Sequence, residues 1–507
     1  MTTTDGLPKG WEEVALSQIA EVRLGRQRSP RRATGPHMVP YLRAANVTWK
    51  GIDLTDVKEM DFTPHEQGTY RLEPGDILLS EASGSPSEVG KPAIWRGQME
   101  SCCFQNTLIR VRSMDPDLRD YLHRHFLADA LTGRFGAASR GVGIHHLGAE
   151  AMSKWVVRIA PAQVRNRIVE AVDRSLSRLD ETVALLERVQ RNLRRYRASV
   201  LKAAVEGRLV PTEAALARAE RRDYEPASAF LKRILAERRS RWEAEGKRGP
   251  VEDPEAPDTS DLPRLPTGWC WAGLEHFLLA IQAGKNFQCL ERPPEAGEVG
   301  VVKVSAVTWG TFDEQESKTC PSPELVNEEH FIRPGDFLIS RANTIQLVAA
   351  CVIVSRIEMT LMLSDKILRL RTVGKVDPWL MWVLRSSHGR REIESLATGN
   401  QESMRNIGQE RIRAIRVPLP PEAECRRIVA EVERQITVIE HSEGVADTSG
   451  RRCSRLRQSI LKWAFEGKLV DQDPKDEPAS ALLARIRAER VLDAPVSAAP
   501  RRTKRKK

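Results

Sequence analysis

Two patterns of hydrophobic and polar positions alternate along the chain. Within residues 7–160, short apolar runs such as residues 108–111 are separated by Gly, Pro and Ser, which is typical of strands joined by turns. From about residue 162 to residue 206, apolar residues recur at every seventh position. This spacing predicts one long coiled-coil helix, about 65 Å long at 1.5 Å per residue, which ends at Gly207. Its seam consists of Val172, Leu179, Leu186, Leu193 and Val200, with Leu176 and Val183 interleaved.

The same pattern is written a second time at an offset of close to 260 residues. Because this period is far longer than a solenoid module, each copy must be a domain with an appended helix, and two similar copies imply two similar sites. The paired motifs are LPKGW at Leu7 and LPTGW at Leu265, NVTWKG at Asn46 and AVTWG at Ala306, EPGDILLS at Glu73 and RPGDFLIS at Arg333, NRIVEAVDR at Asn166 and RRIVAEVER at Arg426, SVLKAAVEGRLV at Ser199 and SILKWAFEGKLV at Ser459, and EPASAFLKRILAERR at Glu225 and EPASALLARIRAER at Glu477.

The helix of the second copy departs from the first in its middle. It keeps seam positions at its two ends, but the segment EHSEGVADTSGRRC between them carries Gly444 and Gly450 where apolar residues are expected. Glycine weakens a helix interior by about 1 kcal/mol relative to alanine. The second helix is therefore predicted to be broken, frayed or supported by another chain. The seam positions that it keeps are Val432, Ile436, Ile439 and Ile460.

Composition adds a preference for an anionic partner. The 507 residues suffice for two to four domains, and the net charge is +10. The basic residues are concentrated locally, since residues 22–52 hold seven of them and no acid. Eight scattered cysteines without a CxxC pair are expected to be reduced and mostly buried. The longest apolar run, residues 347–354, is too short to cross a membrane, and with no signal sequence a cytoplasmic location is expected.

The motifs together resemble one known family. An LPxGW opening in each half, PGDxLxS within each half, and long helices that carry RIVxxV and end in EGRLV or EGKLV are similar to the specificity subunits of Type I restriction-modification systems. Each motif alone is weak, but the combination is specific and covers nearly the whole chain.

The resemblance implies an α+β fold with two homologous mixed α/β target recognition domains. These domains would be separated and joined by long antiparallel coiled-coil helices, in a pseudo-two-fold internal repeat. The implied division is residues 1–160 for the first recognition domain, 161–210 for the central helix, 211–264 for a helical extension and linker, 265–420 for the second recognition domain, 421–470 for the distal helix, and 471–507 for a helical extension and basic tail.

The resemblance also implies function and partners. Each recognition domain would read one half of a bipartite site in double-stranded DNA, while the helices set the spacing and dock two copies of a methyltransferase (modification) subunit. Two restriction/translocase subunits are further partners that the family allows. No cofactor is expected in this chain, and S-adenosylmethionine would be bound by the methyltransferase partner.

Catalytic signatures are missing from the sequence. It has neither the glycine-rich cofactor loop nor the Asn/Asp-Pro-Pro-aromatic clamp of a DNA amino-methyltransferase, and no GxxxxGK[ST] phosphate loop. A self-sufficient methylase or nuclease would show one such constellation. A coiled-coil scaffold without DNA would not need two loop-rich domains, so a DNA-reading adaptor that borrows its catalysis is favoured over both.

The first candidate for DNA contact is the arginine-rich loop at residues 23–32. Arginine matches the O6 and N7 atoms of guanine and is the commonest base reader, whereas the alternative is a solvated basic loop. The residues singled out are Arg23, Arg26, Gln27, Arg28, Arg31 and Arg32.

Further candidates lie in paired loops that diverge between the copies. The loop after the first PGD strand contains Ser83, Ser85, Ser87 and Lys91, and its counterpart contains Arg341, Asn343 and Gln346. A third pair of loops has small and polar residues that allow a close backbone approach to phosphate. It contributes Arg140, His145, His146, Asn400, Gln401 and Arg405, and Lys285 and Asn286 are added after a strand of the second copy. For the two histidines a packing or surface role is the alternative, because a metal site lacks other ligands.

The helices are expected to serve packing and docking. Their seam residues form the coil core, and basic residues beside the seam, from Arg188 to Arg197, are a solvated face or a phosphate contact. By the resemblance, the helix ends are the choice for partner docking, with Glu206, Gly207, Glu466 and Gly467 named there.

Overall fold

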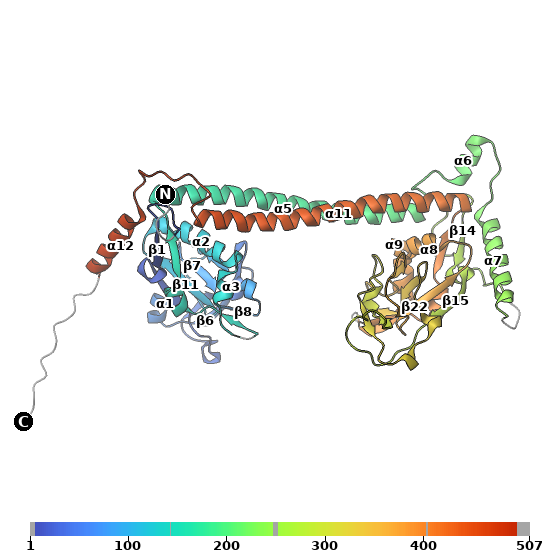
Figure 1. The fold of residues 1–507 in the computed structure, drawn as a ribbon, viewed down its shortest axis with the longest axis horizontal. Helices are drawn as coiled ribbons and strands as arrows, with labels where there is room; N and C mark the ends of the chain where they lie inside the picture. Colours follow the sequence, from blue (N-terminus) through green and yellow to red (C-terminus); the bar gives the residue numbers. More distant parts are fainter. Residues whose placement is uncertain (1–5, 142, 247–251, 402–403, 494–507) are drawn as a thin grey trace, which may run out of the picture. The chain divides into compact units, whose positions relative to one another are not determined.

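The computed structural model describes residues 6–141, 143–246, 252–401 and 404–493 and divides the chain into two compact units (Figure 1). The first unit takes the chain up to Glu187 and everything from Asp447 onward, and the second takes Arg188–Ala446. Each unit therefore combines one strand-rich domain, the first part of one long helix and the last part of the other. The basic tail at residues 501–507 lies outside the described residues.

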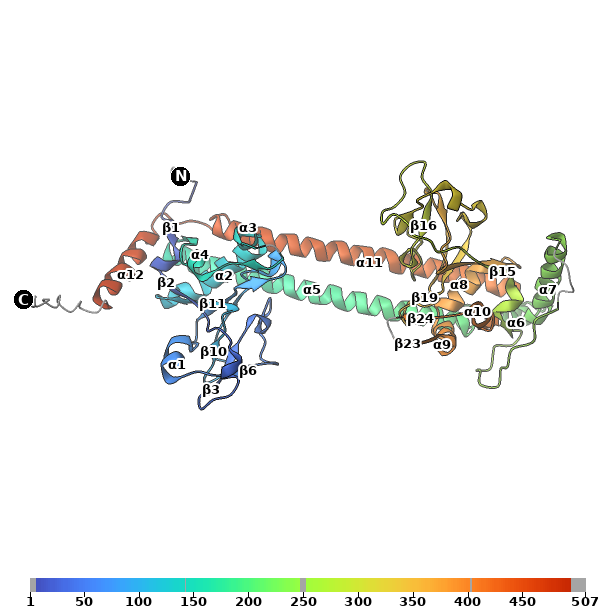
Figure 2. The same cartoon turned by 90° about the horizontal axis from the view of Figure 1, so that it is seen from below.

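The domain of the first unit is built on a four-stranded antiparallel sheet in the order β2-β11-β7-β9. A three-stranded sheet, β10-β3-β6, forms a lobe set apart from helices α2 and α4 (Figure 2). The elements are β1 (Glu12–Ala15), β2 (Ala20–Leu24), β3 (Met38–Leu42), β4 (Val47–Thr48), β5 (Gly51–Ile52), β6 (Lys58–Asp61), α1 (Pro64–Tyr70), β7 (Ile77–Ser80), β8 (Ala82–Ser83), β9 (Pro92–Ile94), β10 (Cys103–Phe104), β11 (Leu108–Ser113), α2 (Arg119–Leu131), α3 (Arg134–Ala138), β12 (His145–His146), α4 (Ala149–Ser153) and β13 (Val156–Ile159).

The domain of the second unit repeats this plan. Its four-stranded sheet has the order β15-β22-β18-β20, and a three-stranded sheet β17-β16-β21 again forms a separate lobe. The elements are β14 (Cys270–Gly273), β15 (Leu278–Ala283), β16 (Gly300–Val302), β17 (Ser317–Thr319), β18 (Phe337–Ser340), β19 (Ala342–Asn343), β20 (Cys351–Ile353), β21 (Leu361–Met362), β22 (Ile367–Thr372), α8 (Asp377–Arg385), α9 (Ser387–Leu396), β23 (Thr398–Gln401), β24 (Met404–Asn406), α10 (Gln409–Arg413) and β25 (Arg416–Leu419).

The two long helices, α5 (Ala162–Val205) and α11 (Glu422–Phe465), pack together as an antiparallel pair, which confirms the predicted α+β fold. Their seam residues are buried or half-buried. In the first unit Arg457 pairs with Asp180, and in the second Arg197 pairs with Glu443 at 2.9 Å.

Helix α11 is continuous, so the predicted break in its middle is wrong. Gly444 is exposed, with open space around the position of a side chain, and Gly450 is half-buried. The buried side chain of Ala446 and the half-buried one of Cys453 keep the seam partly filled between the flanking isoleucines. Packing against α5 offsets the roughly 1 kcal/mol that each glycine costs a helix.

The repeated motifs explain how each helix end joins the domain of the other copy. A side chain on Gly467 would lie 2.3 Å from Pro8, and one on Gly207 would lie 2.6 Å from Pro266, so each EGxLV glycine packs against the other copy's LPxGW motif. The φ angle is positive at both glycines, 64° at Gly207 and 69° at Gly467, a backbone conformation that residues with a side chain rarely adopt. The helical extensions are α6 (Glu213–Glu220), α7 (Ala227–Ala244) and α12 (Ala479–Asp493). Helix α7 packs into the core of the second domain and α12 into that of the first, while Glu213 of α6 pairs with Arg427 of α11.

The described part of the predicted linker, residues 252–264, is held against the second domain. Asp261 pairs with Arg416, and Asp253 pairs with Arg239 of α7. Among the described residues, no helix has the length and the apolar character needed to cross a membrane.

Candidate nucleic-acid interface

The first two candidate loops leave the four-stranded sheet at one edge. Strands β2 and β7 flank β11 and are both antiparallel to it, so they run parallel to each other. Leu24 and Leu79 both pair with Ile109, which places the ends of the two strands side by side. The arginine-rich loop and the loop that follows Ser80 therefore begin next to one another.

The third candidate loop joins the second through a short two-stranded ladder. His145 pairs with Ser83 and His146 with Ala82, as β12 lies antiparallel to β8. The Nδ1 atom of His146 lies 3.1 Å from a carboxylate oxygen of Glu81, and His145 Nδ1 lies 3.3 Å from the hydroxyl of Ser139. All three predicted loops of the first domain thus meet at one edge, which we call the first reading edge.

The second domain builds the same edge from different residues. Ala283 at the end of β15 and Ile339 near the end of β18 both pair with Leu368. Beyond Ser340, Ala342 and Asn343 form β19, which pairs with β24 as β8 pairs with β12. We call this the second reading edge.

The arginines of the first reading edge fall into two classes. The side chain of Arg26 is buried, lies 5.2 Å from the centre of the Phe62 ring and donates to Glu66 at 2.8 Å. Arg32 donates to the same carboxylate at 2.8 Å. Burial alone would raise the pKa of Glu66, but hydrogen bonds from the Thr63 backbone and Arg26 outweigh it and lower the pKa to about 2. Arg26 and Arg32 are thus held by a permanent anion.

Arg28 and Arg31 differ from these, because both are exposed and have no carboxylate partner among the described residues. Arg23 lies between the classes, since it is exposed and pairs with Glu21 at 2.7 Å. A pocket of about 240 Å³ beside the loop is lined by Arg28, Arg32, Arg43 and Lys58, among other residues. The loop therefore presents cationic donors on a frame that Glu66 fixes.

Comparisons with known proteins agree with this arrangement. The chain is 24% identical over 503 residues to the Type I restriction enzyme EcoKI specificity subunit of Escherichia coli (strain K12), covering 96% of each protein. It is also 24% identical over 503 residues to the Type I restriction enzyme StySPI specificity subunit of Salmonella potsdam, again covering 96% of each. No family model matches the chain. The predicted resemblance to Type I specificity subunits is confirmed.

One solved structure has the same fold as this chain. It comes from work on complex assembly and conformational transition of the type I R-M system and has a TM-score of 0.56 at 18% identity. The match covers 91% of this chain and 99% of that chain.

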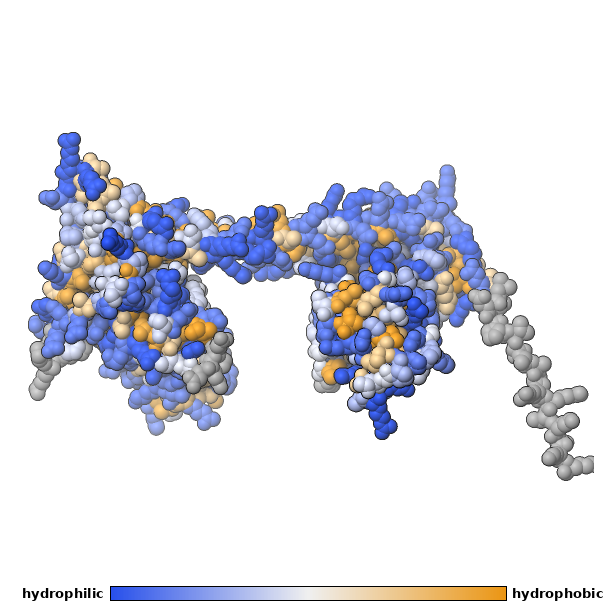
Figure 3. Space-filling model, turned by 180° about the vertical axis from the view of Figure 1, so that it is seen from behind, coloured by the Kyte–Doolittle hydropathy of each residue, from blue (hydrophilic) through white to orange (hydrophobic). Residues whose placement is uncertain are grey.

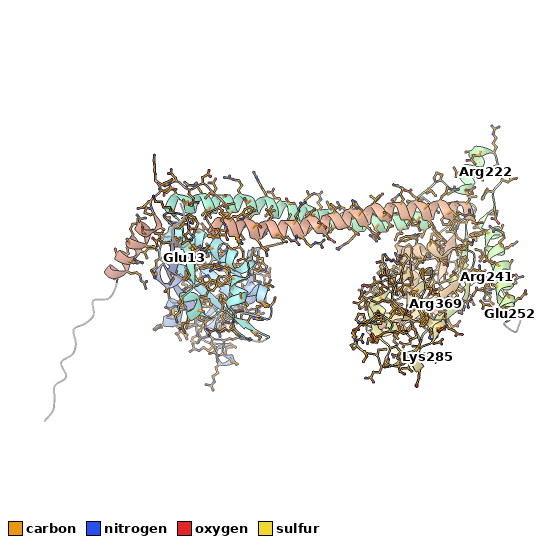
Figure 4. The ribbon with its side chains drawn as sticks, in the orientation of Figure 1. Glu13, Arg222, Arg241, Glu252, Lys285 and Arg369 are labelled. Carbon is orange, nitrogen blue, oxygen red and sulfur yellow. The ribbon has the colours of Figure 1, made fainter. Side chains whose placement is uncertain are left out.

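The remaining residues predicted to contact DNA are spread around the two reading edges. Ser85 and Ser87 are exposed and bonded to each other at 2.8 Å, while Lys91 pairs with Glu88 at 2.5 Å. Lys285 lies at the end of the second domain that is remote from the long helices (Figure 4). Gln27, Arg140, Asn286, Arg341 and Gln346 are exposed, Asn343 and Arg405 are half-buried, and Asn400 and Gln401 lie in β23, where their side chains are outside the described residues. Their roles in DNA contact stay predictions.

Each reading edge is braced by a tryptophan that was not among the predicted site residues. In the first domain Trp49 Nε1 donates to Glu88 at 2.9 Å, and the Lys91 ammonium lies 5.7 Å from the centre of its ring. In the second domain Trp309 Nε1 donates to the Gln346 carbonyl at 2.8 Å, and the Arg390 guanidinium lies 4.7 Å from the ring centre. The repeated VTW motif was the available signal for this brace.

Proposed function

We propose that the chain is the DNA sequence-specificity subunit of a Type I restriction-modification complex, and that each domain reads one half of a bipartite DNA site. The observation that carries the proposal is the reading edge, built twice on one sheet topology from loops of different sequence. Constant strands with divergent polar loops are what two readers of different targets need. Residues 1–160 and 265–420 are the proposed recognition domains.

At the first reading edge, Arg28 and Arg31 are the proposed readers or phosphate contacts, because neither pairs with a carboxylate in the part of the chain that the structure describes. Arg26 and Arg32 act as positioning residues through Glu66. In Type I systems of this kind the chain supplies recognition and no catalysis by itself. The methyl donor, S-adenosylmethionine, would be bound by the methyltransferase partner.

The coiled coil is the proposed spacer and the dock for two methyltransferase subunits. Its seam is occupied within the chain, but seven large apolar side chains remain exposed beside the seam, where Figure 3 shows apolar atoms along the helices. If the seam residues are assigned to heptad positions a and d, these seven side chains occupy positions c and g. Positions c and g are adjacent on the surface of a helix. They are Leu185, Val189 and Tyr196 of α5 and Val438, Val445, Leu456 and Trp463 of α11.

We call this set the apolar flank. In the second unit, the Tyr196 hydroxyl donates to Gln435 at 2.9 Å, which brings the g positions of the two helices together on one side. In the first unit, the recognition domain contacts the other side, through Asp173 and Gln458. The apolar flank is thus left for a partner helix, with restriction subunits joining through the assembled methyltransferase.

Exchange of one domain tests the function. Residues 1–160 would be replaced by the corresponding domain of a relative with a different target, the chain would be assembled with its methyltransferase subunit, and methylated DNA sites would be sequenced. We expect one half of the site to change and the other half and the gap to stay. Methyl transfer by the chain alone, or a change in both halves, would contradict the proposal.

Docking has its own test. Leu456→Ser with Trp463→Ser removes exposed apolar surface from one end of the flank, so less methyltransferase subunit should co-purify. The matched control is Thr448→Ala with Ser454→Ala, which changes exposed polar positions of the same helix outside the c and g positions. Equal recovery of the methyltransferase with both variants would show that the flank is not the dock.

A further inference from the structure

A cavity of about 680 Å³ lies between the first domain and the last part of α11. Its walls come from the end of α2, the start of α3, strand β13, residues 455–465 of α11 and Glu466, which follows the helix. The charged side chains that line it are Arg134, Arg158, Arg455, Lys462, Asp129 and Glu466. Four cations thus face two carboxylates.

Both carboxylates are already engaged by other groups. The side chain of Asp129 is 3% exposed, accepts from Trp155 Nε1 at 2.8 Å, lies 3.1 Å from His125 Nδ1 and pairs with Arg134. Burial would raise the pKa of Asp129, but His125 and Arg134 outweigh it and hold the pKa below its usual value. Glu466 is held by Lys468 at 2.7 Å. The other carboxylate oxygen of Glu466 forms a longer ion pair, at 3.8 Å, with Lys462 of α11, so only this one α11 cation is partly neutralised.

Arg455, which is unpaired among the described residues, and Lys462, which is only loosely paired, are the two α11 cations in the cavity wall. Arg455 has no carboxylate partner among the described residues, and the Lys462 ammonium is 3.8 Å from Glu466, beyond hydrogen-bond distance. They are seven residues apart, so they lie on one face of the helix. Across the cavity, Arg134 is fixed by Asp129 and stacks 5.1 Å from the centre of the Trp155 ring, with 49% of its side chain exposed. Three donors therefore converge on one space.

The cavity adjoins the first reading edge. Helix α3 begins at Arg134 and ends at Ala138, where the loop that carries β12 starts, so about 6 Å of helix separates them. A duplex read at that edge has its sugar-phosphate backbone within reach of the cavity. Phosphate contacts beside the base contacts fix the register of a reader on DNA.

We propose that this cavity binds a phosphodiester group of the DNA backbone beside the half-site that the first domain reads. The proposal rests on the proposed function, because it assumes that the first reading edge meets DNA. Arg455 and Lys462 supply the charge, and Arg134 supplies a guanidinium in fixed position, which suits phosphate recognition.

The second unit repeats the two helix cations as Arg195 and Lys202 but does not gather them around a comparable cavity. The cavity at the corresponding place has only about 220 Å³, and its charged lining residues are Arg264, Arg391 and Glu206. Among the described residues, the larger cavity with the helix cations in its wall thus lies in the first unit, which is where we place the phosphate anchor.

The test uses the full chain assembled with its methyltransferase subunits and a DNA duplex that contains the methylated site. Arg455→Gln with Lys462→Gln is compared with Arg218→Gln with Lys232→Gln, which makes the same charge change at exposed positions of α6 and α7. Affinity is measured over a range of KCl concentrations. The first pair should weaken binding roughly five- to tenfold for the cognate and an unrelated duplex alike, and lower the salt slope by about 1. The control pair should change neither by more than about twofold.

A second measurement locates the contact. Single uncharged methylphosphonate linkages are placed in turn along the duplex. Wild-type protein should lose affinity at one linkage beside the first half-site, and the Arg455→Gln, Lys462→Gln variant should be insensitive there. An unchanged affinity and salt slope, an equal loss in the control pair, or a loss confined to assembly with the methyltransferase would overturn the cavity proposal. Failure of the wild-type complex to prefer any sequence would instead overturn the proposed function.

Discussion

The two compact units share one scaffold and differ in what the scaffold carries. Both place a PGD strand and a VTW tryptophan behind the reading edge. The indole N–H donates to the Glu88 carboxylate from Trp49 and to the Gln346 backbone carbonyl from Trp309. The first edge then offers Arg28 and Arg31, which have no carboxylate partner among the described residues, whereas the second offers Lys285, Asn286 and Arg341. Repeated residues hold the loops and divergent residues fill them, so a change to a repeated residue should damage folding and a change to a divergent one should damage recognition.

The largest expected effect breaks the coil that both units share. Leu186→Pro should abolish the paired helices, because proline in a helix interior costs about 3 kcal/mol or more and a seam residue is lost as well. Helical content by circular dichroism and recovery of the methyltransferase should both fall.

Insertion of four residues after Leu186 lengthens helix α5 by about 6 Å and introduces a stutter that a coiled coil tolerates. It should preserve folding and lengthen the preferred DNA gap by roughly two base pairs.

The same methylated sequence, with the same gap and full activity after the insertion, would show that the helices do not measure distance. The proline variant then shows whether the helices act only as a flexible link between the two domains. A flexible link would still function after the coil is broken.

A smaller effect distinguishes the two helix ends. Gly207→Val and Gly467→Val place a side chain on a left-handed backbone and within 2.6 Å and 2.3 Å of a proline. Strain of this kind costs about 1–3 kcal/mol at each site. Hydrogen exchange measured by mass spectrometry should show loosening of the second unit for Gly207→Val and of the first unit for Gly467→Val.

Gly444→Ala is the matched control, because its side chain would meet open space on a helix. It should stabilise α11 by about 1 kcal/mol. Loosening of both units by either valine substitution would show that the two ends are not separate.

The sequence predicted the helices and the position of the loops, but not how they join. Seam spacing fixes a helix because burial repeats with the helical turn, and PGD followed by divergent residues marks a loop. Nothing in the sequence pattern indicates which helix end packs against which domain. The packing of Gly467 on Pro8 could therefore not be predicted. Charge density likewise could not separate Arg26, which Glu66 holds, from Arg28, because that depends on a carboxylate 38 or 40 residues away in the sequence.

The arginine classes predict different losses at the first edge. Arg28→Ala or Arg31→Ala should weaken cognate DNA binding by about 1–3 kcal/mol where a base contact is lost, and relax the methylated sequence in one half-site only. Arg26→Ala should lower stability first, because it leaves Glu66 with one cation fewer. Arg341→Ala is the control at the second edge and should affect the other half-site. Relaxation of both halves by one substitution would contradict independent reading.

The smallest expected effect comes from the hydrogen-bond partner of the LPxGW tryptophan, which differs between the units. The LPxGW tryptophan donates its Nε1 hydrogen to Gln472 at 3.0 Å in the first unit and to Glu424 at 2.9 Å in the second. Burial raises the pKa of Glu424 above its usual 4.5, although hydrogen bonds from the Glu213 backbone and Trp269 and the charge of Arg427 oppose this. Glu213, paired with Arg222 and Arg427, faces it as well.

A buried acid with a raised pKa is more stable protonated, so its contribution is fully present below the ordinary pKa and is lost as pH rises through the folded-state value. The unfolding free energy of the second unit should therefore decline as pH rises above 4.5. Glu424→Gln should remove that decline, and Gln472→Glu should introduce one in the first unit. Because other carboxylates, such as Glu66, have lowered pKa values and act in the opposite direction, the measurement is the difference between variant and wild type at each pH. If the stability difference between variant and wild type does not vary with pH, Glu424 stays ionised in its buried position. The hydrogen bonds of the two LPxGW tryptophans would then be energetically alike.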